Sequence, residues 1–70
     1  MTMLVTVNGE PRELPDRATI PAILELLSRP VDGRGVAVAV DGEVVPRASW
    51  DHTELADGSS VEVVAAVQGG

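Results

Sequence analysis

The stretch that decides the fold is the last ten residues, VEVVAAVQGG, from Val61 to Gly70. Val61 to Val67 is apolar apart from one glutamate, a composition typical of a strand that is buried on at least one face. Gln68, Gly69 and Gly70 follow directly and, when extended, can reach about 10 Å beyond a sheet at roughly 3.3–3.6 Å per residue. Because glycine lacks a side chain, the last two positions can pass through a narrow channel. The stretch therefore predicts a strand that presents the carboxylate of Gly70 to another molecule.

Two hairpins upstream can supply the neighbours that this strand needs. One runs from Met3 to Leu14 through Asn8-Gly9, and the other runs from Val36 to Arg47 through Asp41-Gly42, with Pro46 ending the return strand. Both turn dipeptides favour two-residue hairpin turns, because their residues tolerate positive φ. We therefore expect four strands before the last one.

A single helix is predicted between the hairpins. Thr19 can act as its N-cap, and Ile20, Ile23, Leu24 and Leu27 fall at the i, i+3, i+4 and i+7 spacing of one apolar stripe. We expect the helix to end near Ser28-Arg29, before Pro30. The segment after the second hairpin, ASWDHTEL, reads as irregular or as one helical turn.

The order of these elements predicts an α+β fold of the β-grasp, or ubiquitin-like, arrangement. Its mixed sheet has about five strands, the helix packs across one face, and a right-handed crossover places the last strand beside the first. We assign residues 1–67 to the domain and residues 68–70 to a flexible Gly-Gly tail. The predicted core contains Val5, Val7, Ile23, Leu24, Leu27, Val38, Trp50, Leu55, Val61 and Val63.

Composition restricts the possible partners. The net charge is −6 and the only aromatic residue is Trp50, which disfavours nucleic acid and anionic membrane surfaces and favours a partner with a basic docking face. The 70 residues include no cysteine and no lysine, so neither disulfides nor lysine amine chemistry is available. With no signal-like or membrane-spanning stretch, we expect a cytoplasmic protein that is a monomer when free.

The chemistry-bearing side chains predict no catalytic site and no metal site. His52 is the only histidine and has no nucleophile or soft ligand near it in sequence, so we interpret it as a solvated loop residue. Trp50 is interpreted as a large plug at one end of the core. If Val61, Val63, Ala65 and Val67 face the helix, Val64 and Ala66 point outward and suggest a docking patch.

Residues 36–70, VAVAVDGEVVPRASWDHTELADGSSVEVVAAVQGG, resemble the ThiS family of sulfur carrier proteins in thiamine biosynthesis, and the resemblance covers nearly the whole chain from Met3 onward. The most specific features are Val45-Pro46-Arg47 followed by Trp50 and the short length. The resemblance implies that a ThiF-like adenylyltransferase uses ATP to adenylate Gly70, which becomes a thiocarboxylate with sulfur from a cysteine desulfurase relay. The resemblance also implies that thiazole synthase, ThiG, would take the sulfur. The chain itself would bind no cofactor, and Val64, Ala66, Val67, Gln68 and Gly69 would contact the partners.

Three other functions fit parts of the same sequence. The small subunit of molybdopterin synthase shares the fold and the Gly-Gly end, although the VPR and Trp50 pattern favours the thiamine family. A protein modifier would form isopeptide bonds through Gly70, and the lack of lysine excludes only chains linked through its own side chains. A purely structural β-grasp module would have no use for the terminal glycines.

Overall fold

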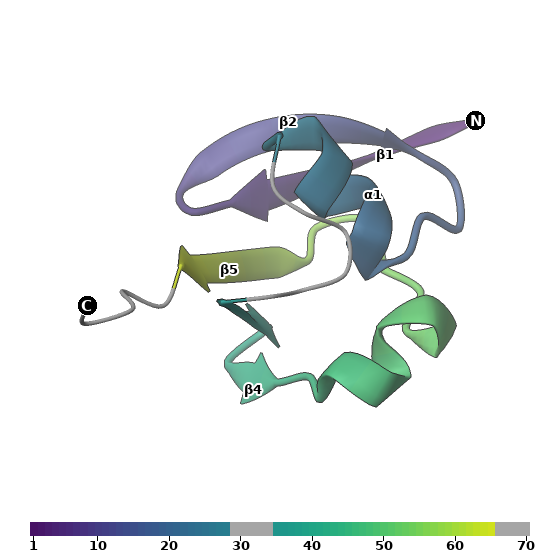
Figure 1. The fold of residues 1–70 in the computed structure, drawn as a ribbon. Helices are drawn as coiled ribbons and strands as arrows, with labels where there is room; N and C mark the ends of the chain where they lie inside the picture. The colour runs from purple at the N-terminus through teal and green to yellow at the C-terminus, as the bar shows by residue number, and fades with distance from the viewer. Residues whose placement is uncertain (29–34, 66–70) are drawn as a thin grey trace.

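The structure is a computed structural model, and it describes residues 1–28 and 35–65. The strands and helices follow one another along the chain in the order shown in Figure 1: β1 Thr2–Val7, β2 Glu10–Pro15, α1 Ile20–Leu26, β3 Val36–Val40, β4 Glu43–Val44, a 3₁₀ helix Arg47–His52 and β5 Ser60–Ala65.

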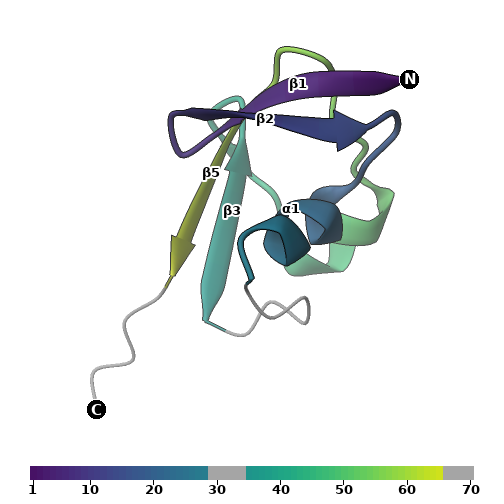
Figure 2. The same cartoon turned by 90° about the horizontal axis from the view of Figure 1, so that it is seen from above.

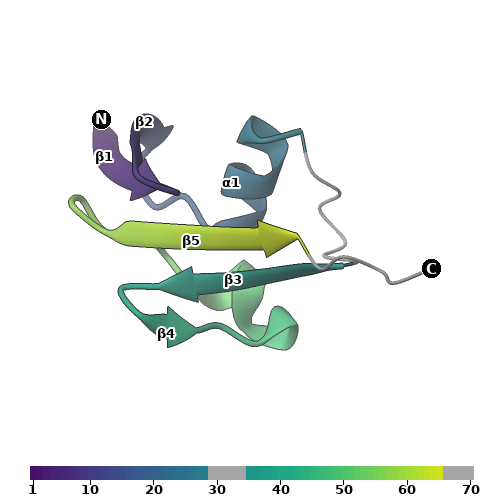
Figure 3. The same ribbon diagram turned by 90° about the vertical axis from the view of Figure 1, so that its left-hand side faces the viewer.

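The strands form one mixed sheet in the order β2-β1-β5-β3-β4. β5 lies in the centre, parallel to β1 through the pairs Thr6 with Ser60 and Val7 with Val61. On its other edge β5 is antiparallel to β3, from Val40 with Val61 to Val36 with Ala65. Figure 3 shows β5 between the first hairpin and β3. The prediction of a β-grasp fold with a central last strand is confirmed.

Both predicted hairpin turns form where the sequence places them. Asn8 and Gly9 have φ of 52° and 83°, and Asp41 and Gly42 have φ of 50° and 87°. Positive φ at both central residues defines a type I′ turn, whose twist matches that of the flanking strands. The turns therefore fix the register of both hairpins from local sequence alone.

The helix ends earlier than predicted, because it stops before Leu27, the last residue of its apolar stripe. Thr19 is the N-cap as predicted, but α1 ends at Leu26, and Ser28 has a left-handed φ of 58°. The Ser28 N–H donates to the Glu25 carbonyl at 3.0 Å, so the last turn tightens. The part of the prediction that concerns Arg29 and Pro30 lies outside the described residues.

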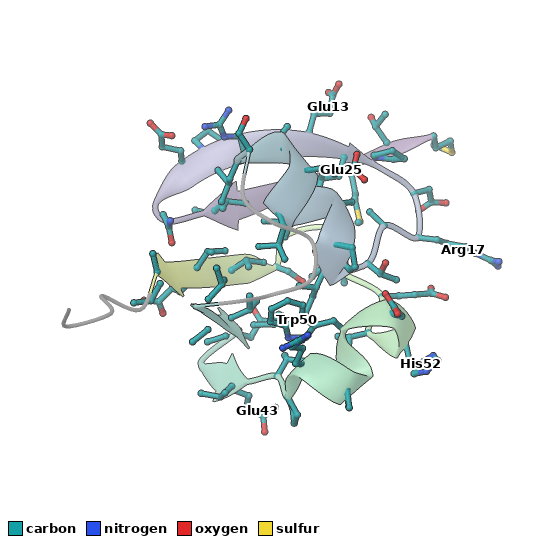
Figure 4. All side chains as sticks on the ribbon, viewed as in Figure 1. Glu13, Arg17, Glu25, Glu43, Trp50 and His52 are labelled. Atoms are coloured by element: carbon teal, nitrogen blue, oxygen red, sulfur yellow. The ribbon has the colours of Figure 1, made fainter. Side chains whose placement is uncertain are left out.

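The core fills the space between the sheet and the two helices, which lie on the same side of β3 and β5 in Figure 2. Of the ten predicted core residues, nine are buried and Leu27 is half-buried against them. The prediction omitted four further buried residues, Met3, Leu14, Ala18 and Ile20. Trp50 is 4% exposed and points inward from the 3₁₀ helix in Figure 4, which confirms its interpretation as a core plug.

The second hairpin differs from its prediction in length. The return strand β4 contains only Glu43 and Val44, although the Val45 N–H still donates to the Val38 carbonyl at 2.9 Å. Pro46, which has no N–H to donate, is instead the N-cap of the 3₁₀ helix. This helix replaces the irregular segment or single turn expected over ASWDHTEL, and it is what delivers Trp50 to the core.

Candidate functional site

The candidate site is built on β5, the central strand. Its start is held on both edges, because Ser59 and Val61 carbonyls accept from the Thr6 and Asn8 N–H groups at 2.9 Å while β3 pairs with the other edge. Val61 and Val63 are buried under the helix side of the sheet, as predicted, but Ala65 is exposed rather than covered by the helix. β5 therefore leads from the middle of the core to one end of the sheet.

The tail residues proposed from the sequence are Ala66, Val67, Gln68, Gly69 and Gly70, and all five lie outside the described residues. Val64 is the one predicted site residue that the structure describes. Its side chain is 61% exposed on the face opposite to the helix, so its outward orientation is confirmed.

Val64 belongs to an apolar patch on the outer face of the sheet. Residues that pair directly across strands share a face, and Val64 pairs with Ala37 while Ala39 pairs with Val44. Val44 is 75% exposed. We call Ala37, Ala39, Val44 and Val64 the outer-face patch. Ala37 is exposed and Ala39 is half-buried, and the exposed Glu62, which pairs with Ala39, borders the patch on the same face. An exposed apolar patch bordered by a carboxylate is suited to docking a protein partner.

Three short polar side chains hold backbone around β5 through hydrogen bonds that the sequence did not predict. Asn8 makes two hydrogen bonds with Val63, Asp41 Oδ1 accepts from the Ser60 N–H at 2.9 Å, and Asp57 Oδ1 accepts from the Leu4 N–H at 2.8 Å. The sequence had predicted Asn8 and Asp41 only as residues of the two hairpin turns. Asn and Asp readily bond nearby backbone from turns, but their partners here depend on the tertiary pairing.

The remaining candidate side chains have structural roles or face solvent. His52 is exposed, as expected, and points away from the body of the molecule in Figure 4. The Thr53 hydroxyl donates to the Ser49 carbonyl at 2.7 Å, and Ser59 Oγ accepts from the Ala56 N–H at 3.2 Å. Residues 1–28 and 35–65 contain no cluster of His, Cys, Asp or Glu that could hold a metal ion. No helix within these ranges is long and apolar enough to cross a membrane.

A shallow hollow lies on the opposite side of the molecule from the outer-face patch. Its lining combines apolar groups with two carboxylates: Glu13, Leu14, Pro15, Ala22, Glu25 and Leu26. Glu13 and Glu25 both carry negative charge there, and Figure 4 shows them on β2 and α1. It is separate from the end of β5, so it plays no part in the candidate site.

A mixed sheet with one helix across a single face, and a central last strand that leads toward two terminal glycines, defines a small ubiquitin-like β-grasp protein. Within that class, the chain belongs to the ThiS family, whose family model matches residues 5–70. The match takes in the Gly-Gly end as well as the described fold.

Relatives and solved structures agree with this family. The chain is 40% identical over 67 residues to the sulfur carrier protein ThiS of Thermus thermophilus, covering 96% of this chain and 100% of that one. It is 38% identical over 68 residues to a thiazole synthase of Paramagnetospirillum magneticum, covering 97% of this chain but only 20% of that protein. The crystal structure of the thiamine biosynthesis protein ThiS from Geobacter metallireducens matches with a TM-score of 0.74 at 34% identity, covering 97% of this chain and 100% of that one.

Proposed function

We propose that this chain is a sulfur carrier of thiamine biosynthesis that transports sulfur as a thiocarboxylate on Gly70. The observation that supports the proposal most directly is the family match over residues 5–70, which includes Gly69 and Gly70. The position of β5 agrees with this function, since a central strand anchors the segment that follows it.

The chemistry requires activation, because a carboxylate is a poor electrophile. A carboxylate oxygen of Gly70 attacks the α-phosphorus of ATP, the bond to the β-phosphate breaks and pyrophosphate leaves. The terminal sulfur of a persulfide, supplied by a cysteine desulfurase relay, attacks the acyl carbon and displaces AMP. A thiolate then cleaves the sulfur–sulfur bond, leaving the thiocarboxylate on Gly70 and a disulfide on the donor. This chain contributes no side chain to these steps, and it has no cysteine that could intercept the acyl group.

The partners follow from this chemistry. We assign adenylation to a ThiF-like adenylyltransferase that binds the ATP, while the carrier itself binds no cofactor. Thiazole synthase, ThiG, is the proposed sulfur acceptor. The thiazole synthase relative supports this pairing, because one fifth of its length matches nearly the whole of this chain. We also propose a cytoplasmic location, because the proposed reaction needs ATP and a cysteine-derived sulfur relay.

Docking is assigned to the outer-face patch together with the exposed carboxylate of Glu62, which pairs with Ala39 on the same face. The pair of Val64 with Ala37 lies near the end of β5, whereas Ala39 and Val44 lie nearer its start, so a partner bound over the Val64 end of the patch is close to the point where β5 stops. The net charge of −6 favours a basic docking face on the enzyme. Apolar contact would supply affinity, and charge would steer the encounter.

Intact mass spectrometry of the protein purified from its own cells tests the proposal. A species in which one oxygen is replaced by sulfur, located at Gly70, is the expected result. In vitro, the chain with ATP and its activating enzyme should support exchange of pyrophosphate into ATP, and amidation of the terminal carboxylate should abolish it. Undiminished exchange with the amide, or attachment of Gly70 to other proteins in place of the sulfur species, would contradict a carrier function.

A further inference from the structure

The end of β5 is held differently from its start. β1 pairs with β5 only as far as Val61, and β4 pairs with β3 only over Ala39 and Val40, with one further hydrogen bond from Val45 to Val38. Beyond these points Val36-Ala37 and Val64-Ala65 form a two-stranded ribbon, which Figure 2 shows running away from β1 and β2. Isolated two-stranded ribbons are marginally stable and twist strongly.

The side chain of Asn8 lies at the base of this ribbon. Asn8 Oδ1 accepts a hydrogen bond from the Val63 N–H at 2.8 Å, and Asn8 Nδ2 donates to the Val63 carbonyl at 3.2 Å. These are the two hydrogen bonds that a residue of a neighbouring strand would make. The backbone of Asn8 bonds the Val61 carbonyl, and its side-chain amide bonds the next residue on the same edge of β5, Val63. The side chain therefore extends the pairing on this edge beyond the end of β1.

Asparagine meets two requirements at this position. Its backbone has φ of 52°, a left-handed conformation that asparagine tolerates better than most residues with a side chain. Its amide also offers both an acceptor and a donor, whereas aspartate offers acceptors alone and glycine offers neither. The hairpin turn by itself needs only the backbone conformation.

We propose that Asn8 is a positioning residue for the activation of Gly70. By fixing the Val63 backbone, the Asn8 amide sets the direction in which the chain leaves the sheet toward the reacting carboxylate. This inference rests on the proposed function. A displacement of about 1 Å at a reacting centre can cost roughly 10²-fold in rate. A less firmly held Val63 backbone should therefore lower the rate at which Gly70 is adenylated.

Asp41 provides a matched control at the opposite end of β5. It occupies the same position in an identical type of turn, with φ of 50°, and its Oδ1 accepts from the Ser60 N–H at 2.9 Å. Asn8→Gly and Asp41→Gly both preserve the turn conformation and remove side-chain bonds to β5. Only Asn8→Gly acts on the end that leads to Gly70. Asp41→Asn controls for the lost charge.

The test compares kcat and KM for pyrophosphate exchange by the activating adenylyltransferase, at a temperature where every variant is folded. Asn8→Gly should lower kcat by roughly tenfold or more while KM stays near the parent value, because the outer-face patch is intact. Asn8→Asp keeps the acceptor for the Val63 N–H, so its kcat should lie between those of the parent and Asn8→Gly. Asp41→Gly and Asp41→Asn should keep the parent kcat. Hydrogen exchange should accelerate in Asn8→Gly at the Val63 amide, which donates to Asn8 Oδ1.

Several results would overturn the inference. Equal losses of kcat in Asn8→Gly and Asp41→Gly would assign the effect to general stability, and a change confined to KM would assign it to docking. Unchanged exchange at the Val63 amide would show that the Asn8 contact does not hold the strand. If the parent chain supports pyrophosphate exchange and any of these results is found, only the role of Asn8 is overturned. If the parent chain supports no pyrophosphate exchange, the proposed function is overturned, and the role of Asn8 with it.

Discussion

Trp50 illustrates which properties of a single residue follow from sequence. As the sole aromatic side chain in a small chain, it was predicted to fill one end of the core, and it is 4% exposed. Its indole Nε1–H also donates to the Val45 carbonyl at 2.9 Å. That hydrogen bond could not be predicted, because it depends on β4 ending early and on the 3₁₀ helix turning the ring back toward Val45.

Replacing Trp50 should separate packing from hydrogen bonding. Trp50→Ala is expected to destabilise the fold by about 3–5 kcal/mol, since it empties a large buried site. Trp50→Phe keeps most of the apolar volume and should cost less, with about 1 kcal/mol from the lost hydrogen bond. Urea unfolding followed by circular dichroism measures both. An unchanged midpoint for Trp50→Ala would show that the ring is not part of the core.

The proposed function requires that Gly69 have no side chain, so that the tail can enter a narrow channel on the activating enzyme. Gly69→Val adds a β-branched side chain that would crowd a channel around the tail and disfavour positive φ. If Gly69 belongs to the tail predicted from the sequence, the free energy of unfolding should stay within about 0.5 kcal/mol of that of the parent. Pyrophosphate exchange and thiazole formation should fall by about 10²-fold, because the reacting carbonyl is displaced. Full activity alongside an unchanged melting curve would mean that the tail does not enter a narrow channel.

At the scale of elements, features set by local sequence, such as the hairpin turns, could be predicted. The exact ends of elements and the pairing of strands, which depend on tertiary structure, could not. The turns at Asn8-Gly9 and Asp41-Gly42 are set by dipeptides and appear where expected. α1 and β4 are both shorter than predicted, because the left-handed Ser28 and the change of direction at Pro46 are not visible in apolar periodicity. The outward orientation of Val64 followed from strand alternation, but the pairs that join it to Ala37, Ala39 and Val44 required the sheet register.

Docking by β5 can be tested with a pair of charge-matched substitutions. Val64→Glu places a carboxylate in the outer-face patch, whereas Leu26→Glu places one on α1, on the other side of the molecule, where Leu26 is 41% exposed. Both should keep the free energy of unfolding within about 1 kcal/mol of the parent. Val64→Glu should raise KM for the activating enzyme by roughly tenfold, equivalent to about 1.4 kcal/mol, and Leu26→Glu should not. The same increase for both variants would indicate a general charge effect rather than a docking patch.

At the scale of the whole molecule, the prediction is that a folded domain holds the segment proposed to react. The sheet order and the packing of both helices on one side follow from the order of elements and the handedness of the crossover. The division into a domain of residues 1–67 and a tail of residues 68–70 stays a prediction, because residues 66–70 lie outside the described part of the chain. It can be decided by experiment, since the two parts are assigned different tasks.

A chain truncated after Val67 should dock without being activated. If the domain is complete without Gln68, Gly69 and Gly70, the truncated chain should unfold cooperatively, within about 0.5 kcal/mol of the full chain. It retains the outer-face patch and lacks the reacting carboxylate in its working position, so we expect competitive inhibition of pyrophosphate exchange by the full chain, with an inhibition constant close to the KM of that chain. The truncated chain with Val64→Glu is the control. Its inhibition constant should rise by the same factor as the KM of the full chain with Val64→Glu.

Loss of cooperative unfolding on truncation would place the domain boundary later in the sequence. A folded truncated chain that fails to compete would show that affinity resides in the tail, and the docking role assigned to the sheet would then be wrong.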